Sequence, residues 1–139
     1  MLRESDNGTS ELLVKEIGLQ VAGEGSTAAG TRVVLETLRL LGLPTVGVKV
    51  VDGSGLDPGN SVTCRLLVTL LDAQGSGGTI DRALPVAGQT GTMSKRFLAT
   101  PVAGRLRAKT GSIKGIAAAP QAGANATEDS RWRATPRRR

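Results

Sequence analysis

Apolar side chains recur at helical intervals in the first stretch of the chain. Between about residues 11 and 21, Leu13 and Ile17 lie one helical turn apart, and Glu11 and Lys15 form a favourable i,i+4 charge pair. This pattern predicts an amphipathic helix. Gly18 is an unfavourable helix residue and is a candidate for the end of that helix.

A second helical pattern follows a glycine-rich link. Ser26 is a good N-cap, and from there to about Leu41 the apolar side chains repeat at helical spacing; they are Val33, Val34, Leu38 and Leu41. Gly42 and then Pro44 are residues expected just after the end of a helix. The pattern predicts a second helix that stops there.

The middle of the chain predicts a strand, a turn and a third helix. Val46, Val48 and Val50 alternate as in a short strand, and residues 52–55 are a turn sequence. A third helix is expected over about residues 61–73, with Asn60 as its N-cap, before a Gly/Ser-rich loop at 74–78. That loop lacks the Gly-Lys-Ser/Thr ending of a phosphate-binding loop.

The last third of the chain is less regular. After an irregular region that begins at Leu84, residues 104–109 are predicted to form a strand with Leu106 and Ala108 on one face. Ile113 and Ile116 are apolar positions across a turn from it. Helices combined with short strands correspond to an α+β fold.

Composition separates the end of the chain from its body. Residues 120–139 are rich in Ala, Pro, Gly, Thr and Arg without periodicity, so we expect a globular part at 1–119 and a disordered basic tail at 120–139. The five arginines and two acidic residues of 128–139 account for half of the net charge of +6. The high isoelectric point therefore says little about the body. The tail is consistent with translation of GC-rich DNA in another reading frame, which inspection of the alternative frames would test.

Several classes of site are excluded by residues that the chain lacks. It has no histidine, which excludes histidine-dependent triads and ordinary zinc hydrolase sites, and its single cysteine permits neither an intrachain disulfide nor a cysteine metal site. Cys64 has apolar neighbours and is expected to be buried. No signal-peptide core or stretch of membrane-spanning length is found in these residues.

Two short motifs carry the candidate chemistry. Ser5-Asp6-Asn7 precedes the first predicted helix, and Lys109-Thr110-Gly111-Ser112 ends the last predicted strand. Serine acyl-transfer enzymes that bind penicillins arrange a Ser-x-x-Lys, a Ser-Asp-Asn and a Lys-Thr-Gly around one cleft. In such a cleft a serine hydroxyl relays a proton, and a lysine supplies positive charge beside an anionic substrate terminus.

A third block makes the combination more specific. Asp52-Gly53-Ser54-Gly55-Leu56, followed by Asn60, lies between the two motifs in the expected order. With the stretches at 2–18 and 84–115, it makes residues 1–118 resemble the penicillin-binding serine-type D-Ala-D-Ala carboxypeptidase/endopeptidase family. Class A β-lactamases share the other two motifs, but the Asp-Gly-Ser-Gly-Leu block favours the carboxypeptidases.

The resemblance implies a fold and an activity. The fold is a partial penicillin-binding/β-lactamase-like transpeptidase fold, with helices packed on an incomplete antiparallel sheet. The activity is cleavage of D-Ala-D-Ala bonds in peptidoglycan stem peptides through an acyl-enzyme that β-lactams also form, outside the cytoplasmic membrane and without cofactor or metal. By position, Ser5, Asn7 and Lys109 match catalytic residues, while Thr110, Gly111 and Ser112 match residues that bind the substrate.

The chain also departs from the family pattern. No serine is followed three positions later by lysine, so the nucleophile motif is not present in these 139 residues, and we expect a C-terminal part that is inactive alone. Without the remainder of the domain, apolar helix faces should be exposed and the chain prone to aggregation. Thr90 stands where the family has an acidic residue before Gly-Thr, and Asp57-Pro58-Gly59 replaces a Ser-Arg-type sequence.

Two other functions stay open at this point. The Lys109 segment could bind peptidoglycan peptides without catalysis, as a binding module. The arginines of the tail could bind nucleic acid, although no recognition motif or aromatic platform accompanies them, so a specific nucleic-acid partner is not predicted.

Overall fold

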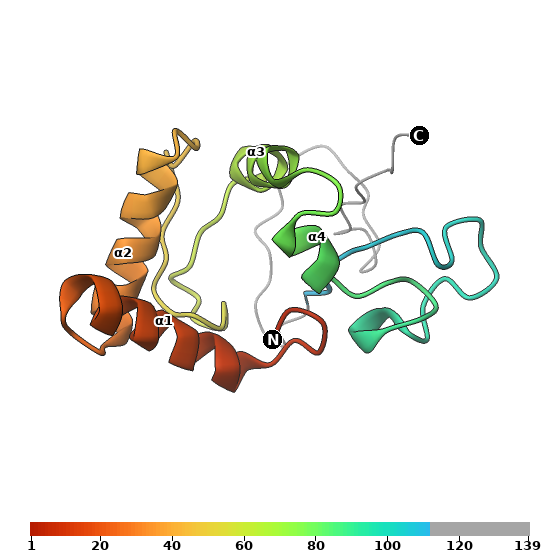
Figure 1. Ribbon diagram of the computed structural model, residues 1–139, viewed down its shortest axis with the longest axis horizontal. Helices are drawn as coiled ribbons and strands as arrows, with labels where there is room; N and C mark the ends of the chain where they lie inside the picture. Colours follow the sequence, from red (N-terminus) through yellow and green to blue (C-terminus); the bar gives the residue numbers. More distant parts are fainter. Residues whose placement is uncertain (112–139) are drawn as a thin grey trace. The chain divides into compact units, whose positions relative to one another are not determined.

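The computed structural model describes residues 1–111, which form two compact units. The first unit consists of Met1 and Asp6–Arg82, and the second of Leu2–Ser5 and the chain from Ala83 onward. The helices are α1 (Asn7–Ala22), α2 (Thr27–Leu40), α3 (Cys64–Gln74) and α4 (Thr79–Ala83), with a 3-10 helix at Gly91–Met93 (Figure 1).

Polar caps set the starts of the three long helices. The Asp6 carboxylate accepts from Thr9 N–H at 3.0 Å, and the Ser26 hydroxyl accepts from Ala29 N–H at 3.1 Å. The predicted cap at Ser26 is confirmed, whereas α1 begins four residues earlier than expected because Asp6 caps it. α3 begins at Cys64 with Thr63 as its N-cap, so the predicted cap at Asn60 is wrong.

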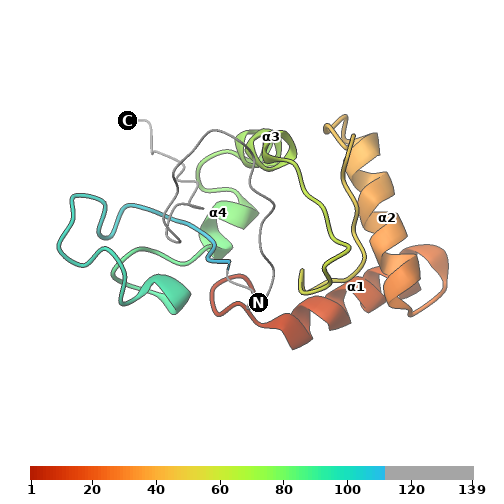
Figure 2. The same cartoon turned by 180° about the vertical axis from the view of Figure 1, so that it is seen from behind.

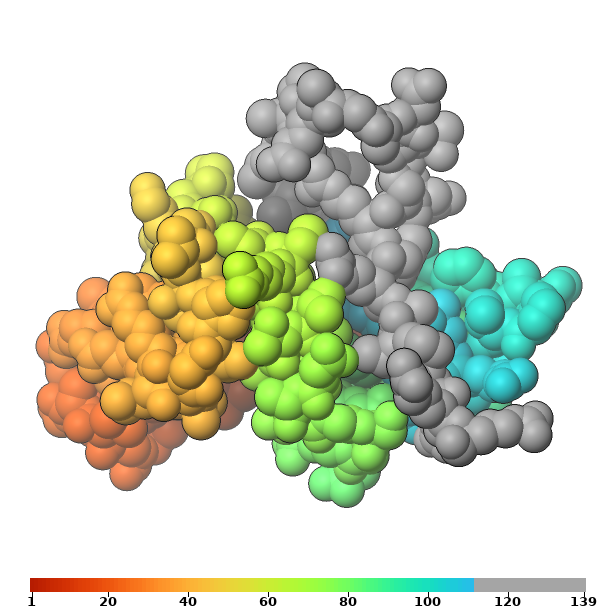
Figure 3. All heavy atoms as spheres, turned by 90° about the horizontal axis from the view of Figure 1, so that it is seen from above, coloured from red at the N-terminus to blue at the C-terminus, as the bar shows by residue number. Residues whose placement is uncertain are grey.

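Two glycines allow α1 and α2 to pack closely in the first unit. Figures 1 and 2 show the two helices side by side. A Cβ at Gly30 would lie 1.9 Å from the carbonyl oxygen of Val14, and one at Gly18 would lie 2.6 Å from that of Glu24. The suggested end of α1 at Gly18 is wrong: the helix continues through this glycine, whose lack of a side chain serves the contact with the following turn and α2. The space-filling view shows α1 and α2 packed against each other (Figure 3).

An apolar cluster joins α2 and α3 within the first unit. Leu43, Val48 and Leu66 are buried at its centre, with Leu35, Leu38, Val50 and Leu70 packed around them. Gly42 adopts a left-handed conformation (φ 70°) after α2, which confirms the predicted helix stop. Burial of this cluster is the hydrophobic contribution that holds the segment after α2 against both helices.

The predicted strands do not form within residues 1–111. Only two isolated antiparallel bridges are present there, Lys49 with Ser61 and Val86 with Arg107. The expected incomplete antiparallel sheet is therefore wrong for the described residues. The alternation was a sound guide to burial, since Leu106 and Ala108 are both buried on one face, but each segment pairs at a single position.

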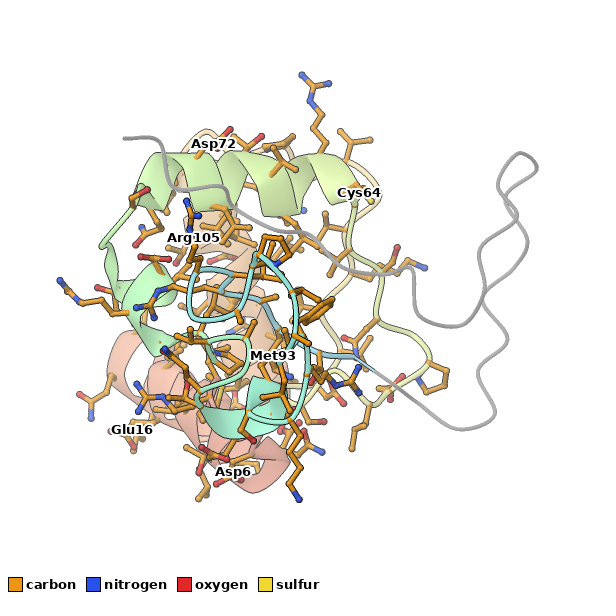
Figure 4. All side chains as sticks on the ribbon, turned by 90° about the vertical axis from the view of Figure 1, so that its right-hand side faces the viewer. Asp6, Glu16, Cys64, Asp72, Met93 and Arg105 are labelled. Atoms are coloured by element: carbon orange, nitrogen blue, oxygen red, sulfur yellow. The ribbon has the colours of Figure 1, made fainter. Side chains whose placement is uncertain are left out.

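The core of the second unit surrounds Met93, which is fully buried (Figure 4). Ala87, Leu106 and Ala108 complete the cluster, and Phe97 packs against it. Backbone hydrogen bonds hold the two chain segments together: Ala87 N–H donates to Leu106 at 2.9 Å, and Ala108 N–H donates to Pro85 at 3.2 Å. The residues just before Lys109 are thereby fixed to a packed core.

Some expectations are corrected or fall outside the described residues. Cys64 is exposed at the first position of α3, so its expected burial is wrong (Figure 4). Within the described residues, no helix combines the length and the apolar character needed to cross a membrane. Ser112, Ile113, Ile116, the boundary at 119 and the tail at 120–139 lie beyond the described part.

The first unit exposes large apolar side chains, and we expect the isolated chain to self-associate. The exposed fractions are 68% for Leu12 and 69% for Val21 on α1, and 88% for Leu40 on α2. Sedimentation velocity at micromolar concentrations should show species larger than a monomer. Replacing Leu12 and Val21 with glutamate should shift the distribution toward monomer, and a monomeric parent chain would contradict the expectation.

Candidate active site

A lysine and a serine from opposite ends of the described chain meet in the second unit. Lys109 Nζ donates to Ser5 Oγ at 2.7 Å, across a sequence separation of 104 residues. The same ammonium donates to the carbonyl oxygen of Thr110 at 2.7 Å. Because the serine oxygen accepts from lysine, the Ser5 hydroxyl proton is free to be donated elsewhere. The two predicted motifs thus meet through these side chains.

The backbone at Ser5 is strained. Its φ of 57° lies in the left-handed region, which residues with a Cβ adopt infrequently. Ser5 is followed at once by Asp6, whose extended backbone and side chain cap α1. The serine therefore lies at a sharp change of chain direction, and strain of this kind is common at functional sites.

Lys109 is placed by the core of the second unit. Leu106 and Ala108 are buried, and Lys109 directly follows them on the segment bonded to residues 85–87. Burial lowers the pKa of the Lys109 amine below its ordinary value. A lysine with a lowered pKa gives up a proton more readily, which suits a group that exchanges protons with a neighbouring hydroxyl.

Of the other predicted residues of the Lys109-Thr110-Gly111-Ser112 motif, the structure describes Thr110 and Gly111. Thr110 Oγ1 donates to Thr92 Oγ1 at 3.1 Å. A Cβ at Gly111 would meet nothing within 4 Å among the described residues, so local packing does not require glycine there. Ser112 lies outside the described residues.

Asn7 belongs to the first unit. It is the first residue of α1, directly after the N-cap Asp6, and is exposed. Hydrogen bonds from the Thr9 hydroxyl and Thr9 N–H to the Asp6 carboxylate lower the pKa of Asp6 and fix the helix start. The central residue of the Ser-Asp-Asn motif is therefore a structural cap.

The loop at 52–60 in the first unit is organised around the carboxylate of Asp52. That carboxylate accepts from the N–H groups of Gly55, Leu56 and Asp57 at 2.7, 3.1 and 2.9 Å, and from the side chains of Ser54 and Asn60. Asn60 Oδ1 accepts from Val51 N–H at 2.8 Å. Asn60 thus serves the loop, which explains why it does not cap α3.

Glu11 connects this loop to α1. Its Oε1 accepts from the N–H groups of Gly53 and Ser54, both at 2.8 Å. Gly53 is tightly packed there, since a Cβ would lie 2.5 Å from the carbonyl oxygen of Ser10. The Asp-Gly-Ser-Gly-Leu block is thereby held on the helix that begins with Asn7.

We expect substitution of Asp52 with asparagine to remove a stabilisation that depends on pH. Burial raises the pKa of Asp52, but the hydrogen bonds from Asp57, Asn60, Ser54 and Gly55 outweigh it and lower the pKa from 3.8 to about 2. A lowered carboxyl pKa stabilises the fold above pH 3.8, and the gain is lost as pH falls toward 2. After allowance for solvent screening we expect a loss of about 1 kcal/mol at neutral pH.

Urea unfolding at pH 7 and pH 2 would measure this effect. Parent and Asp52→Asn should differ at pH 7 and converge at pH 2, while Asp72→Asn, at an exposed position of α3, should match the parent at both. An equal difference between parent and Asp52→Asn at the two pH values would refute the assigned cause.

Two contributors to the site in the second unit were not predicted from the sequence: Thr92 and Arg3. Thr92 contacts Thr110 through its hydroxyl and Arg3 through its backbone. The Gly91-Thr92 pair, which keeps the Gly-Thr of the family-like stretch, was the available signal. Thr90 accepts from Val86 N–H at 2.9 Å, a role that the expected acidic residue could also fill.

Comparison with known proteins places the chain in a family. The model of the D-Ala-D-Ala carboxypeptidase 3 (S13) family matches residues 1–134. The chain belongs to this family. This membership confirms the resemblance drawn from the three sequence blocks.

Individual members of the family agree with this assignment. The chain is 42% identical over 125 residues to a D-alanyl-D-alanine carboxypeptidase from Actinomadura sp. (strain R39), covering 84% of this chain and 23% of the relative. It is 38% identical over 125 residues to carboxypeptidase DacB from Mycolicibacterium smegmatis, covering 83% and 27% of the two chains. The chain thus spans about a quarter of the length of these relatives.

A solved structure supports the fold. Penicillin binding protein 4 from Haemophilus influenzae, crystallised with a β-lactam, matches with a TM-score of 0.75 and 27% identity, covering 83% of this chain and 28% of that one. The expected relation to the penicillin-binding fold is confirmed by this similarity.

Proposed function

We propose that the chain provides the Ser-Asp-Asn and Lys-Thr-Gly part of the active site of a serine-type D-Ala-D-Ala carboxypeptidase. The observation that carries this proposal is the 2.7 Å hydrogen bond from Lys109 Nζ to Ser5 Oγ. It joins the two motifs that these enzymes arrange around one cleft.

In the proposed reaction Ser5 relays a proton. Its oxygen accepts from Lys109, so its own proton can be donated to the leaving amine while the oxygen regains a proton from the ammonium side. The lowered pKa of Lys109 assists this exchange. Asn7, at the start of α1, would hold a backbone carbonyl of the substrate through its amide.

The substrate that we propose follows from the charge of Lys109 and from the hydroxyl groups beside it. Lys109 supplies positive charge for the terminal carboxylate of a peptide, and Thr110 and Ser112 supply hydroxyl donors for the same group. A Cβ at Gly111 would meet none of the described residues within 4 Å, which suits an extended peptide lying beside the backbone. We assign peptidoglycan stem peptides that end in D-Ala-D-Ala as the substrates, and β-lactams as the inhibitors. The peptides would be bound outside the cytoplasmic membrane.

We assign the role of nucleophile to a serine that is not among these 139 residues. No serine in the 139 residues has a lysine three positions later, and neither Ser5 nor Ser112 lies in such a motif. Ser5, Asn7 and Lys109 therefore act as helpers around a nucleophilic serine, and the 139-residue polypeptide alone should not become covalently labelled by a fluorescent penicillin.

A chimaera tests the proposal. The matching segment of the Actinomadura carboxypeptidase would be replaced by this 139-residue chain, and hydrolysis of an acyl peptide ending in D-Ala-D-Ala would be measured. We expect the chimaera to hydrolyse the peptide and to release D-alanine. A folded chimaera that retains no hydrolysis, beside an active parent enzyme, would reject the proposed function. Reversible peptide binding without hydrolysis would favour the binding module instead.

A further inference from the structure

The segment at 90–93 contacts both motif-bearing segments of the second unit. Thr92 N–H donates to the carbonyl oxygen of Arg3 at 3.1 Å, two residues before Ser5. The Thr92 hydroxyl accepts from Thr110 Oγ1 at 3.1 Å, one residue after Lys109. A single threonine is thus bonded to the neighbours of both Ser5 and Lys109.

Gly91 permits this close approach. Its φ of 53° is left-handed, and a Cβ there would lie 2.1 Å from the Arg3 carbonyl oxygen and 2.7 Å from Arg3 Cγ. Any larger residue would force the Arg3 backbone to move by more than the tolerance of a hydrogen bond. The position of Ser5 therefore depends on glycine at 91.

The segment at 90–93 is itself anchored to the core. Met93 is fully buried, and its carbonyl oxygen accepts from Gly88 N–H at 2.9 Å. Thr90 Oγ1 accepts from Val86 N–H at 2.9 Å. Since Thr90 and Met93 are both held by the core, Thr92 can fix the positions of Arg3 and Thr110 and does not simply move with them.

We propose that Thr92, supported by Gly91, is a positioning residue that keeps Ser5 and Lys109 within hydrogen-bonding distance and orients the Thr110 hydroxyl toward the substrate carboxylate. Each hydroxyl can either donate or accept. In the structure Thr110 donates to Thr92. When a substrate carboxylate takes over the Thr110 proton, Thr92 can donate to Thr110 Oγ1 instead, so the Thr110 hydroxyl stays in place to bond the carboxylate. The second part of this role rests on the proposed function, and the first part does not.

The titration of Lys109 tests the first part without any substrate. In the full chain with ¹³Cε-labelled lysine, the five lysines give few signals, and that of Lys109 is identified by its loss in Lys109→Arg. We expect Lys109 to titrate below the ordinary lysine value of 10.5. In Gly91→Ala its midpoint should rise to that ordinary value, and in Thr92→Val it should rise part of the way.

Matched variants separate positioning from general damage. Thr92→Ser keeps the hydroxyl and should restore the parent midpoint of Lys109. The Thr100 hydroxyl donates locally to the Phe97 carbonyl, so Thr100→Val should leave the midpoint unchanged. Equal midpoints for Thr92→Val and Thr92→Ser would overturn the proposal, even if Gly91→Ala failed to fold. It would also be overturned if Lys109 of the parent titrated at the ordinary lysine value of 10.5.

The chimaera separates this proposal from the proposed function. There Thr92→Val should raise KM about tenfold with a smaller change in kcat, because the contact with the carboxylate is weakened. Thr92→Ser should recover KM, and a KM for Thr92→Val equal to that of the parent would overturn the role in carboxylate binding. If the lysine titration moves as expected but the unmodified chimaera is inactive, the proposed function fails while the positioning of Lys109 stands.

Discussion

In the chimaera, Lys109→Ala is expected to slow acylation by penicillin by about a hundredfold to a thousandfold, the range found when one preorganised electrostatic group is removed. The substitution removes the positive charge that we propose lies beside the carboxylate of the β-lactam, and it removes the donor that bonds to Ser5 at 2.7 Å. Stopped-flow labelling with a fluorescent penicillin measures the rate.

Controls distinguish loss of charge from loss of fold. Lys95→Ala removes an exposed lysine from the same unit and should leave the rate unchanged.

Ser5→Ala combined with Lys109→Ala should slow acylation by less than the sum of the single effects on the activation free energy, since the two groups act as a unit. Burial lowers the pKa of Lys109, so acylation should decline with rising pH before the ordinary lysine range near 10.5. Additive effects of the two substitutions would contradict the proposed pair.

Gly30→Ala is expected to destabilise the first unit by about 3 kcal/mol or more, at the upper end of the cost of overpacking. The new Cβ would lie 1.9 Å from the Val14 carbonyl oxygen, 2.6 Å from its carbon and 2.7 Å from Cγ1 of the same residue. Two of these atoms belong to the backbone of α1, so a change of side-chain rotamer cannot relieve the clash. The helices would have to separate.

Urea denaturation of the 139-residue chain, followed by far-ultraviolet circular dichroism below the onset of self-association, measures this loss. Gly8→Ala is the matched control, because its Cβ would approach only the Asp6 carboxylate, at 3.5 Å. As a helical glycine without crowding, it should instead gain about 0.5–1 kcal/mol. Equal stability of the two variants would show that the close contact of α1 with α2 is wrong.

Local signals predicted local structure well. The cap at Ser26 and the stop at Gly42 depend on one or two neighbouring residues and were confirmed. The helix end predicted at Gly18 is wrong because helix propensity describes an isolated helix, whereas this glycine allows a close contact with a later part of the chain. Asn60 was misjudged because the loop around Asp52 uses its side chain first.

Strands were harder to predict because alternation reveals a buried face and not a pairing partner. Residues 104–108 do have a buried face, yet in the described part of the chain this segment pairs with residues 85–87 as an isolated bridge, Val86 with Arg107, and not as a strand. The meeting of Ser5 and Lys109 was anticipated through family motifs. The supporting contacts of Thr92 were not, since no periodic pattern relates position 92 to positions 3 and 110.

The central claim is that these residues assist a nucleophile which they do not contain. The most direct test is to acylate the chimaera with penicillin and to locate the acyl group by peptide mass spectrometry. We predict that the acyl group is attached to a serine contributed by the Actinomadura enzyme and to none within the 139 residues. An acyl group on Ser5, Ser112 or any other serine of this chain would contradict the account.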